Sequence, residues 1–163
     1  MPDNPLAVYD WPRIRRLMFI CHGNICRSPM AESVMAHLLR QAGREDITVA
    51  SAATSTEELG NPIHPGALAV MRRHGIVPIP HRARQLRQSD ADDYDLFLGM
   101  DTANVRNSLR LLGQGGEGRC LRLLACAGLQ RDIADPWYTG EFDATWDDIL
   151  LGCQSLLKLL VNS

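Results

Sequence analysis

A short stretch near the N-terminus, CHGNICRS at positions 21–28, carries side chains suited to holding a tetrahedral phosphate dianion against a sulfur nucleophile. The backbone N–H groups of a short loop can turn inward and form an anion-binding nest. Gly23 permits backbone angles that a side chain would forbid. Arg27 can grip phosphate oxygens with its planar guanidinium, a geometry that lysine does not offer. The residue types in this loop therefore point to phosphate chemistry at Cys21.

The elements around the loop decide whether Cys21 can react. Residues 17–21 (LMFIC) form a continuous apolar run, which is typical of a strand buried on both faces. Ser28 and Pro29 indicate an N-cap and the first position of a helix. A cysteine beside a helix N-terminus ionises easily, and the thiolate is the required nucleophile. Taken alone, the C-x5-R spacing favours a buried core cysteine and a surface arginine instead.

Strands and helices alternate along the rest of the chain. Apolar runs predict further strands over residues 47–52, 95–100 and 120–124. The first helix is expected to end at Gly43, a second helix covers residues 65–74, and Asp101 can cap a third. Residues 113–118 (GQGGEG) indicate a flexible turn. The C-terminal helix is marked by an apolar stripe at helical spacing, formed by Trp146, Ile149, Leu150, Cys153, Leu156, Leu157 and Leu160.

This alternation predicts an α/β fold: a single domain whose four-stranded parallel sheet has helices on both faces. The phosphate-binding loop lies between the first strand and the first helix. Ligands of such sheets bind beyond the carboxyl ends of the strands, which is where Cys21 is placed. The 163 residues suit one domain. We assign residues 1–13 to an N-terminal extension and residues 14–163 to the domain itself.

The overall composition excludes several classes of protein. A formal net charge of -2 gives no reason to expect nucleic acid or an acidic membrane surface as a partner. No apolar run approaches the roughly 18 residues that a membrane span needs. Residues 1–12 lack the basic-then-apolar layout of a signal peptide. We therefore expect a cytoplasmic protein that does not bind a membrane.

The cysteines indicate neither a disulfide framework nor a metal site. The chain has five of them at irregular spacing. Cys21 and Cys26 have no matching Cys/His pair downstream that could complete a zinc site. We expect no metal and no other cofactor, and we interpret Cys120, Cys126 and Cys153 as structural residues.

Phosphate transfer also needs an acid that protonates the leaving oxygen. Asp135 is the best candidate on local grounds, because Pro136 fixes an extended or turn geometry for it. Two aromatic residues, Trp137 and Tyr138, follow on the same loop and could form apolar walls around a phenyl ring. The tetrapeptide DPWY alone favours a packed surface turn.

The segment CHGNICRSPMAE resembles the phosphate-binding signature of low-molecular-weight protein tyrosine phosphatases. Larger tyrosine phosphatases place their C-x5-R late in a longer chain. The resemblance implies a cofactor-free protein tyrosine phosphatase in which Cys21 is the nucleophile, Arg27 holds the phosphate and Asp135 is the general acid. It continues in family order through SAATS (51–55), HRARQ (81–85), DLFLGMD (95–101) and DPWY (135–138).

The same resemblance implies roles for the residues around the nucleophile. Asn24 is expected to hold a strained loop backbone, and Ser28 to donate a hydrogen bond to the sulfur. His81 is expected to join this network, although by itself it suggests an exposed loop histidine. Cys26 can form a reversible disulfide with Cys21 that protects it from deeper oxidation, or it is a buried spectator thiol. The phosphate-binding loop as a whole comprises His22, Gly23, Asn24, Ile25, Cys26 and Ser28, together with Cys21 and Arg27.

The rim of the pocket is expected to include Glu57, Trp137 and Tyr138. Ile25 presents an apolar wall that favours phosphotyrosine, because related phosphoarginine phosphatases tend to carry threonine there. Glu57 stands where many members of the family have an aromatic residue, and Trp137 where they often have a second tyrosine. An acidic rim of Glu57 and Glu58 favours basic sequence around the phosphotyrosine or weakens peptide binding.

Three other functions compete with a tyrosine phosphatase. A protein phosphoarginine phosphatase is the nearest alternative. A thioredoxin-coupled arsenate reductase needs further cysteines that relay a disulfide, and Cys120 and Cys126 do not match the place of that relay. An inactive phosphate-binding module is expected to lack Cys21, Arg27 or the acid. The partners implied are phosphotyrosine-containing proteins, and we expect a monomer, with a weak dimer as the alternative.

Overall fold

The centre of the molecule is a four-stranded parallel sheet, in a computed structural model that describes residues 5–162. Its strands are β1 (Arg16–Cys21), β2 (Thr48–Ala53), β3 (Leu96–Gly99) and β4 (Cys120–Arg122). They are ordered β2-β1-β3-β4, so β1 is an interior strand. Cys21, the last residue of β1, pairs in register with Ala53 at the end of β2. The predicted α/β fold is confirmed.

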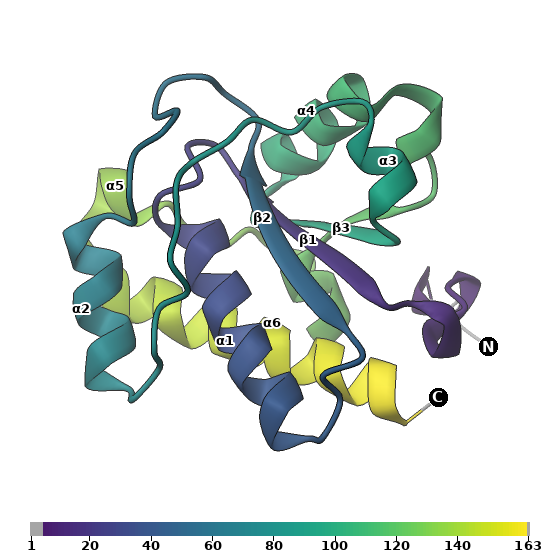
Figure 1. Cartoon of the computed structure of the whole chain (residues 1–163), viewed down its shortest axis with the longest axis horizontal. Helices are drawn as coiled ribbons and strands as arrows, with labels where there is room; N and C mark the ends of the chain where they lie inside the picture. The colour runs from purple at the N-terminus through teal and green to yellow at the C-terminus, as the bar shows by residue number, and fades with distance from the viewer. Residues whose placement is uncertain (1–4, 163) are drawn as a thin grey trace.

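Both faces of the sheet are buried, as the continuous apolar run of β1 requires. Leu17 and Phe19 belong to the core on one face, whereas Met18 and Ile20 belong to a second core on the other. The two sets of helices lie on opposite sides of the sheet (Figure 1). On the first side are α1 (Arg27–Gln41), α2 (Pro65–Arg73) and α6 (Phe142–Val161), and on the second α3 (Asp90–Asp93) and α4 (Thr102–Leu112).

The longer helices occupy the segments that helical spacing predicts. α2 ends one residue before His74, and the chain then turns at Gly75, whose φ is 73°. Asp101 caps α4 and forms a reciprocal capping box with Asn104. The apolar stripe of α6 faces the core, where its buried members are Trp146, Ile149, Cys153, Leu156 and Leu160.

The predicted start of the first helix is wrong. α1 begins at Arg27 with Cys26 at the N-cap, so Ser28 is the second helical residue and Pro29 the third. The loop before the helix closes around the Cys21 sulfur. The Ser28 hydroxyl consequently lies against that sulfur and does not cap the helix.

Short 3-10 helices and one short α-helix occupy segments that, apart from the start of η4, lie outside the predicted strands and helices. They are η1 (Pro5–Val8), η2 (Trp11–Arg13), η3 (Gly113–Gly116), η4 (Leu123–Ala127) and α5 (Pro136–Thr139). The predicted flexible turn thus begins with a helical turn, η3. The fourth strand is shorter than expected, because Leu123 and Leu124 belong to η4 and are buried in the core.

The predicted N-terminal extension is described only in part. Residues 1–4 lie outside the described residues, but Trp11 packs into the core and is 7% exposed. None of the helices within residues 5–162 is long and apolar enough to cross a membrane.

The carboxyl ends of β1, β2 and β3 meet at one edge of the sheet. The amide of Thr54, just after β2, donates to the Cys21 carbonyl at 3.0 Å. The amide of Met100, just after β3, donates to the Ile20 carbonyl at 3.1 Å. These bonds hold the loops after the strands beside one another, so residues far apart in sequence meet around Cys21.

Candidate active site

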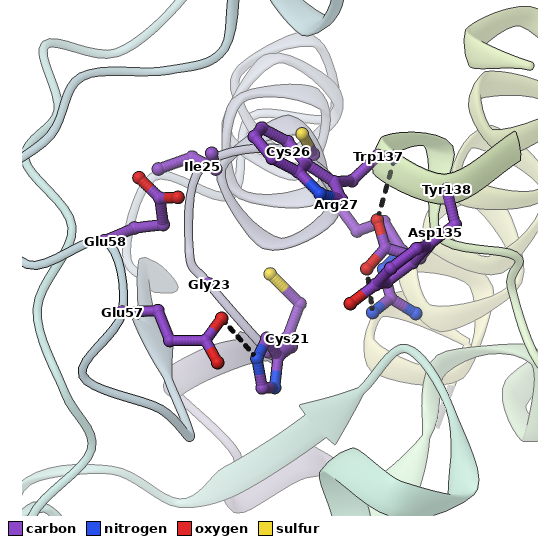
Figure 2. Close-up of a pocket in the computed structure, with 11 residues that line it drawn as sticks. Cys21, Gly23, Ile25, Cys26, Arg27, Glu57, Glu58, Asp135, Trp137 and Tyr138 are labelled. Atoms are coloured by element: carbon purple, nitrogen blue, oxygen red, sulfur yellow. Dashed lines mark hydrogen bonds and ion pairs between the residues drawn. The ribbon is translucent and has the colours of Figure 1, made fainter. Parts of the chain in front are cut away.

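The loop between β1 and α1 wraps around the sulfur of Cys21. The backbone amide of Asn24 donates to Cys21 Sγ at 3.2 Å, which turns the middle of the loop toward the sulfur. Asn24 adopts a φ of 60°, the only positive φ of a non-glycine residue within residues 5–162. Such a conformation strains a residue with a Cβ and persists only where its surroundings hold it. The Cys21 side chain points into the hollow that the loop encloses (Figure 2).

A buried serine supplies a second contact to the sulfur. Ser28 Oγ lies 3.0 Å from Cys21 Sγ and accepts a hydrogen bond from Asn24 Nδ2 at 2.8 Å. Either atom can donate in this contact, but a thiolate sulfur can only accept, and the Ser28 proton is then directed at it. A hydroxyl that donates to sulfur favours the thiolate form of a cysteine.

The strained Asn24 is held by partners from two other segments, β2 and residues 81–84. Its Nδ2 donates to Ser51 Oγ at 3.0 Å, and its Oδ1 accepts from the backbone amide of Arg84 at 3.1 Å. His81 Nε2 lies 2.6 Å from the Asn24 carbonyl, which can only accept, so Nε2 carries the proton. Burial lowers the pKa of His81, with the Asn24 hydrogen bond opposing it. Ser51 in turn donates to Glu32 Oε1 at 2.6 Å.

Arg27 is almost fully buried, with 2% of its side chain exposed, yet it bears a charge. Its Nη1 donates to Asp101 Oδ2 at 2.8 Å and to the Ile133 carbonyl at 2.9 Å. Burial by itself disfavours the charged guanidinium. The negative charges of Cys21, Asp101 and Asp135 outweigh this effect and raise the pKa of Arg27. The cation is therefore fixed in one orientation at the floor of the hollow.

Asp135 reaches the hollow from the opposite side. Its Oδ2 lies 3.4 Å from Arg27 Nη2, and its Oδ1 accepts from the backbone amide of Trp137 at 3.0 Å. That second bond caps α5, whose first residue is Pro136. The turn therefore aims the carboxylate at the same space as the Cys21 sulfur (Figure 2).

The rim combines aromatic and acidic residues. Trp137 and Tyr138 are 54% and 78% exposed and stand at the mouth of the pocket. Glu57 lies 3.0 Å from His22 Nε2. Ile25 lines the pocket but is only 8% exposed, so it offers a small apolar surface. The complete lining consists of Cys21, His22, Gly23, Ile25, Cys26, Arg27, Glu57, Glu58, Asp135, Trp137 and Tyr138.

Of the sequence-predicted site residues, His81, Asn24 and Ser28 lie behind the pocket rather than in its lining. Four further residues hold these groups or Arg27 in place, and sequence assigned none of them a role in the site; Asp101 was expected only to cap a helix. Ser51 and Asp101 fall within the segments SAATS and DLFLGMD. The family resemblance therefore marked these segments, but it did not show which side chains the two residues contact. Arg84 lies in HRARQ, and Glu32 is the last residue of CHGNICRSPMAE.

The other thiols differ from Cys21 in their surroundings. Burial, reinforced by the charges of Cys21 and Asp135, raises the pKa of Cys26 to about 12. Burial likewise raises the pKa of Cys120 to about 11 and that of Cys126 to about 12. All five cysteines are free thiols. Within residues 5–162, no group of three or more His, Cys, Asp or Glu side chains is placed to hold a metal ion.

Comparison with known proteins decides the family. Residues 16–163 match the family model described as low molecular weight phosphotyrosine protein phosphatase. The chain belongs to this family. It is 35% identical over 145 residues to the low molecular weight protein-tyrosine-phosphatase PtpA of Staphylococcus aureus, a match that covers 88% of this chain and 92% of PtpA.

Solved structures agree with this chain in fold. The crystal structure of YfkJ from Bacillus subtilis superposes with a TM-score of 0.83 at 35% identity, covering 88% of this chain and 92% of YfkJ. SP-PTP, a low molecular weight protein tyrosine phosphatase from Streptococcus pyogenes, gives 0.81 at 32% identity, with 91% and 94% covered. The family membership that the loop signature indicates is confirmed.

Proposed function

We propose that this chain hydrolyses phosphotyrosine in proteins through a phosphocysteine intermediate, without a metal ion. The observation that carries the proposal is the convergence of three groups on one hollow: the Cys21 sulfur, the buried Arg27 guanidinium and the Asp135 carboxylate. Each comes from a different segment, and each contributes one of the parts that phosphoryl transfer needs. Family membership supports the same reaction.

In the first step, the substrate phosphate occupies the loop. Arg27 and the inward-facing loop N–H groups bind its oxygens and stabilise the charge that develops on them. The Cys21 thiolate attacks phosphorus in line, so a P–S bond forms as the P–O bond to tyrosine breaks. Asp135, protonated at this stage, gives its proton to the departing phenolate oxygen.

In the second step, the same carboxylate acts as a base. Asp135 takes a proton from a water molecule whose oxygen attacks phosphorus. The P–S bond breaks, inorganic phosphate leaves and the Cys21 thiolate returns. Ser28, which lies 3.0 Å from the sulfur, stabilises this thiolate as a leaving group and as a nucleophile.

The pocket rim supports an aromatic substrate. Trp137 and Tyr138 provide exposed aromatic surface at the mouth, and Ile25 adds an apolar contact beside the phosphate position. Glu57 and Glu58 add negative charge at the rim, which favours basic residues next to the phosphotyrosine. Relay chemistry of the arsenate reductase type is disfavoured, because burial keeps Cys120 and Cys126 protonated at neutral pH.

A hydrolysis panel in the presence of a metal chelator tests the proposal. The substrates are matched peptides carrying phosphotyrosine, phosphoarginine or phosphoserine, each with basic and acidic flanks. We expect turnover of the phosphotyrosine peptide, highest with basic flanks, and no turnover by a Cys21→Ser variant that still binds phosphate. Turnover by Cys21→Ser, or faster hydrolysis of phosphoarginine, contradicts the proposal in its mechanism or its substrate respectively.

We also propose a cytoplasmic monomer whose phosphatase domain comprises residues 14–163, with residues 1–13 as an extension. Five free thiols suit a reducing compartment. The buried Trp11 suggests that the extension stabilises the domain by packing on it, so removal of residues 1–13 is expected to lower the melting temperature and leave kcat/KM unchanged. Sedimentation equilibrium tests the monomer directly.

A further inference from the structure

His64 connects two walls of the pocket without lining it. Its backbone amide donates to the carbonyl of Ile25, in the phosphate-binding loop, at 2.8 Å. Its ring meets the ring of Trp137 edge-on, with centroids 5.7 Å apart and an interplanar angle of 81°. Edge-on aromatic contacts at this distance are attractive. One residue therefore touches both the loop that holds the phosphate and the aromatic side chain that stands over it.

The ring of His64 is itself held on its other sides. It stacks on Phe142, at the start of α6, with centroids 5.3 Å apart and planes 21° from parallel. Its Nδ1 accepts from the amide of Gly66 at 2.9 Å and so caps α2. Because Nδ1 accepts, the imidazole is held in the tautomer with its proton on Nε2.

The sequence explains why the stack can form. A Cβ at Gly66 would come within 2.5 Å of the Phe142 ring, so the missing side chain makes room for that ring. Phe142 also packs against a small buried cluster that contains Ile25 and Cys26. The His64 ring is thus fixed relative to the phosphate-binding loop.

Trp137, in contrast, stands on the short turn that follows Asp135 and is 54% exposed. Its orientation depends on contacts that reach it from outside the turn, and the His64 ring is one of them. We propose that His64 is a positioning residue that sets the gap between Trp137 and the phosphate-binding loop. It thereby adapts the pocket to the flat ring of an aryl phosphate. This inference rests on the proposed phosphatase function and assigns its aromatic selectivity to a contact behind the pocket.

Two substitutions separate the ring of His64 from its capping nitrogen. His64→Asn keeps an acceptor for the Gly66 amide but removes the ring, and His64→Phe keeps a ring but removes the acceptor. The probes are phenylphosphonate, which occupies both the phosphate loop and the aromatic slot, and inorganic phosphate, which occupies the loop alone. Their dissociation constants are measured by calorimetry, so no turnover is required.

We expect His64→Asn to weaken phenylphosphonate binding about 2- to 10-fold, the range of one aromatic contact, while phosphate binding stays constant. His64→Phe should retain the wild-type ratio of the two constants and unfold at a lower temperature, because the cap of α2 is lost. In a Trp137→Ala background, His64→Asn should have no further effect on the ratio.

An unchanged ratio in His64→Asn, or an equal loss for both probes, overturns the inference. An effect that persists undiminished in the Trp137→Ala background overturns it too, since His64 would then act by another route. Failure of the proposed function looks different: the wild-type protein would bind both probes but hydrolyse no phosphotyrosine peptide. Absence of binding of both probes by the wild-type protein contradicts the function and the inference together.

Discussion

Asp135 lies 3.4 Å from Arg27, measured from Oδ2 to Nη2, although 108 residues separate them in the chain. The same guanidinium donates to Asp101. Arg27 therefore contacts two carboxylates, of which Asp135 lines the pocket, and in the proposed reaction its charge attracts phosphate. This arrangement places the acid candidate within reach of a bound phosphate before any substrate arrives, which reduces the reorganisation needed for reaction.

Asp135→Asn tests the role of this carboxyl group as an acid. The amide keeps the size of the side chain but cannot give a proton to the leaving oxygen. We expect kcat to fall about 10²- to 10⁴-fold for phenyl phosphate, with a smaller loss for p-nitrophenyl phosphate, whose leaving group needs less protonation. Steady-state kinetics with both substrates measure the difference. Asp132→Asn is the matched control, since Asp132 pairs with Arg122 outside the pocket and should change neither rate. Equal losses for the two substrates in Asp135→Asn would contradict the acid role.

Asp101 has two tasks that substitution can separate. Its Oδ1 accepts from the Asn104 amide at 2.7 Å and caps α4, while its Oδ2 holds Arg27. Asp101→Ser keeps a capping oxygen but loses the partner of Arg27, whereas Asp101→Ala loses both. Both variants should lose roughly 10-fold in kcat/KM, the effect of one charged hydrogen bond. Only Asp101→Ala should also lose about 1 kcal/mol in the free energy of unfolding. Chemical denaturation measures the loss of stability, and steady-state kinetics measure the loss of activity. An Asp101→Ser variant with the wild-type kcat/KM would show that the function of Arg27 does not depend on its contact with Asp101.

Cys26 should react far more slowly than Cys21 with an alkylating reagent. Burial raises the pKa of Cys26 to about 12, so its thiol stays protonated near neutral pH, and a protonated thiol is a poor nucleophile. At about pH 7, iodoacetamide should modify Cys21 and leave Cys26 free, and inorganic phosphate should slow the reaction at Cys21. Peptide mass spectrometry identifies the modified residue. Comparable labelling of the two thiols, or no protection by phosphate, would be at odds with this account.

The partly buried carboxyl group of Glu32 should make the free energy of unfolding depend on pH. Burial raises its pKa, with the Ser51 hydrogen bond and the charge of Arg84 opposing the shift. An acid whose pKa is raised on folding contributes stability that is present below its unfolded pKa and is lost as pH rises through the folded value. Relative to Glu32→Gln, the wild-type protein should therefore be more favoured at about pH 4 than at about pH 7. Urea unfolding at the two pH values measures this. A difference between the proteins that is independent of pH would rule out the predicted titration.

Sequence predicts those features that local patterns control. The apolar run of β1, the helical stripe of α6 and the capping residue Asp101 each depend on neighbours within a few residues, and all three are confirmed. The start of α1 is the exception. Ser28 has the residue type of a cap, but the sulfur of Cys21 competes for its hydroxyl once the loop closes.

The contacts that sequence does not reveal join distant segments. Asp101 was expected only to cap a helix, and its second oxygen on Arg27 requires the ends of β1 and β3 to be adjacent. Ser51 and Glu32 meet only when α1 packs on β2. His64 had no role assigned from sequence, because its contacts form only when the fold places Phe142 and Trp137 beside its ring. The spacing of residues along the chain does not predict these long-range contacts.

The central claim is that phosphate passes through the sulfur of Cys21. A rapid acid quench of the wild-type enzyme turning over a phosphotyrosine peptide, followed by digestion and mass spectrometry, tests it most directly. The account predicts a phosphorylated peptide whose modification maps to Cys21, formed in the same burst that releases tyrosine peptide and absent from Cys21→Ser. Phosphate on another residue, or full turnover with no phosphorylated Cys21 at any quench time, would contradict it.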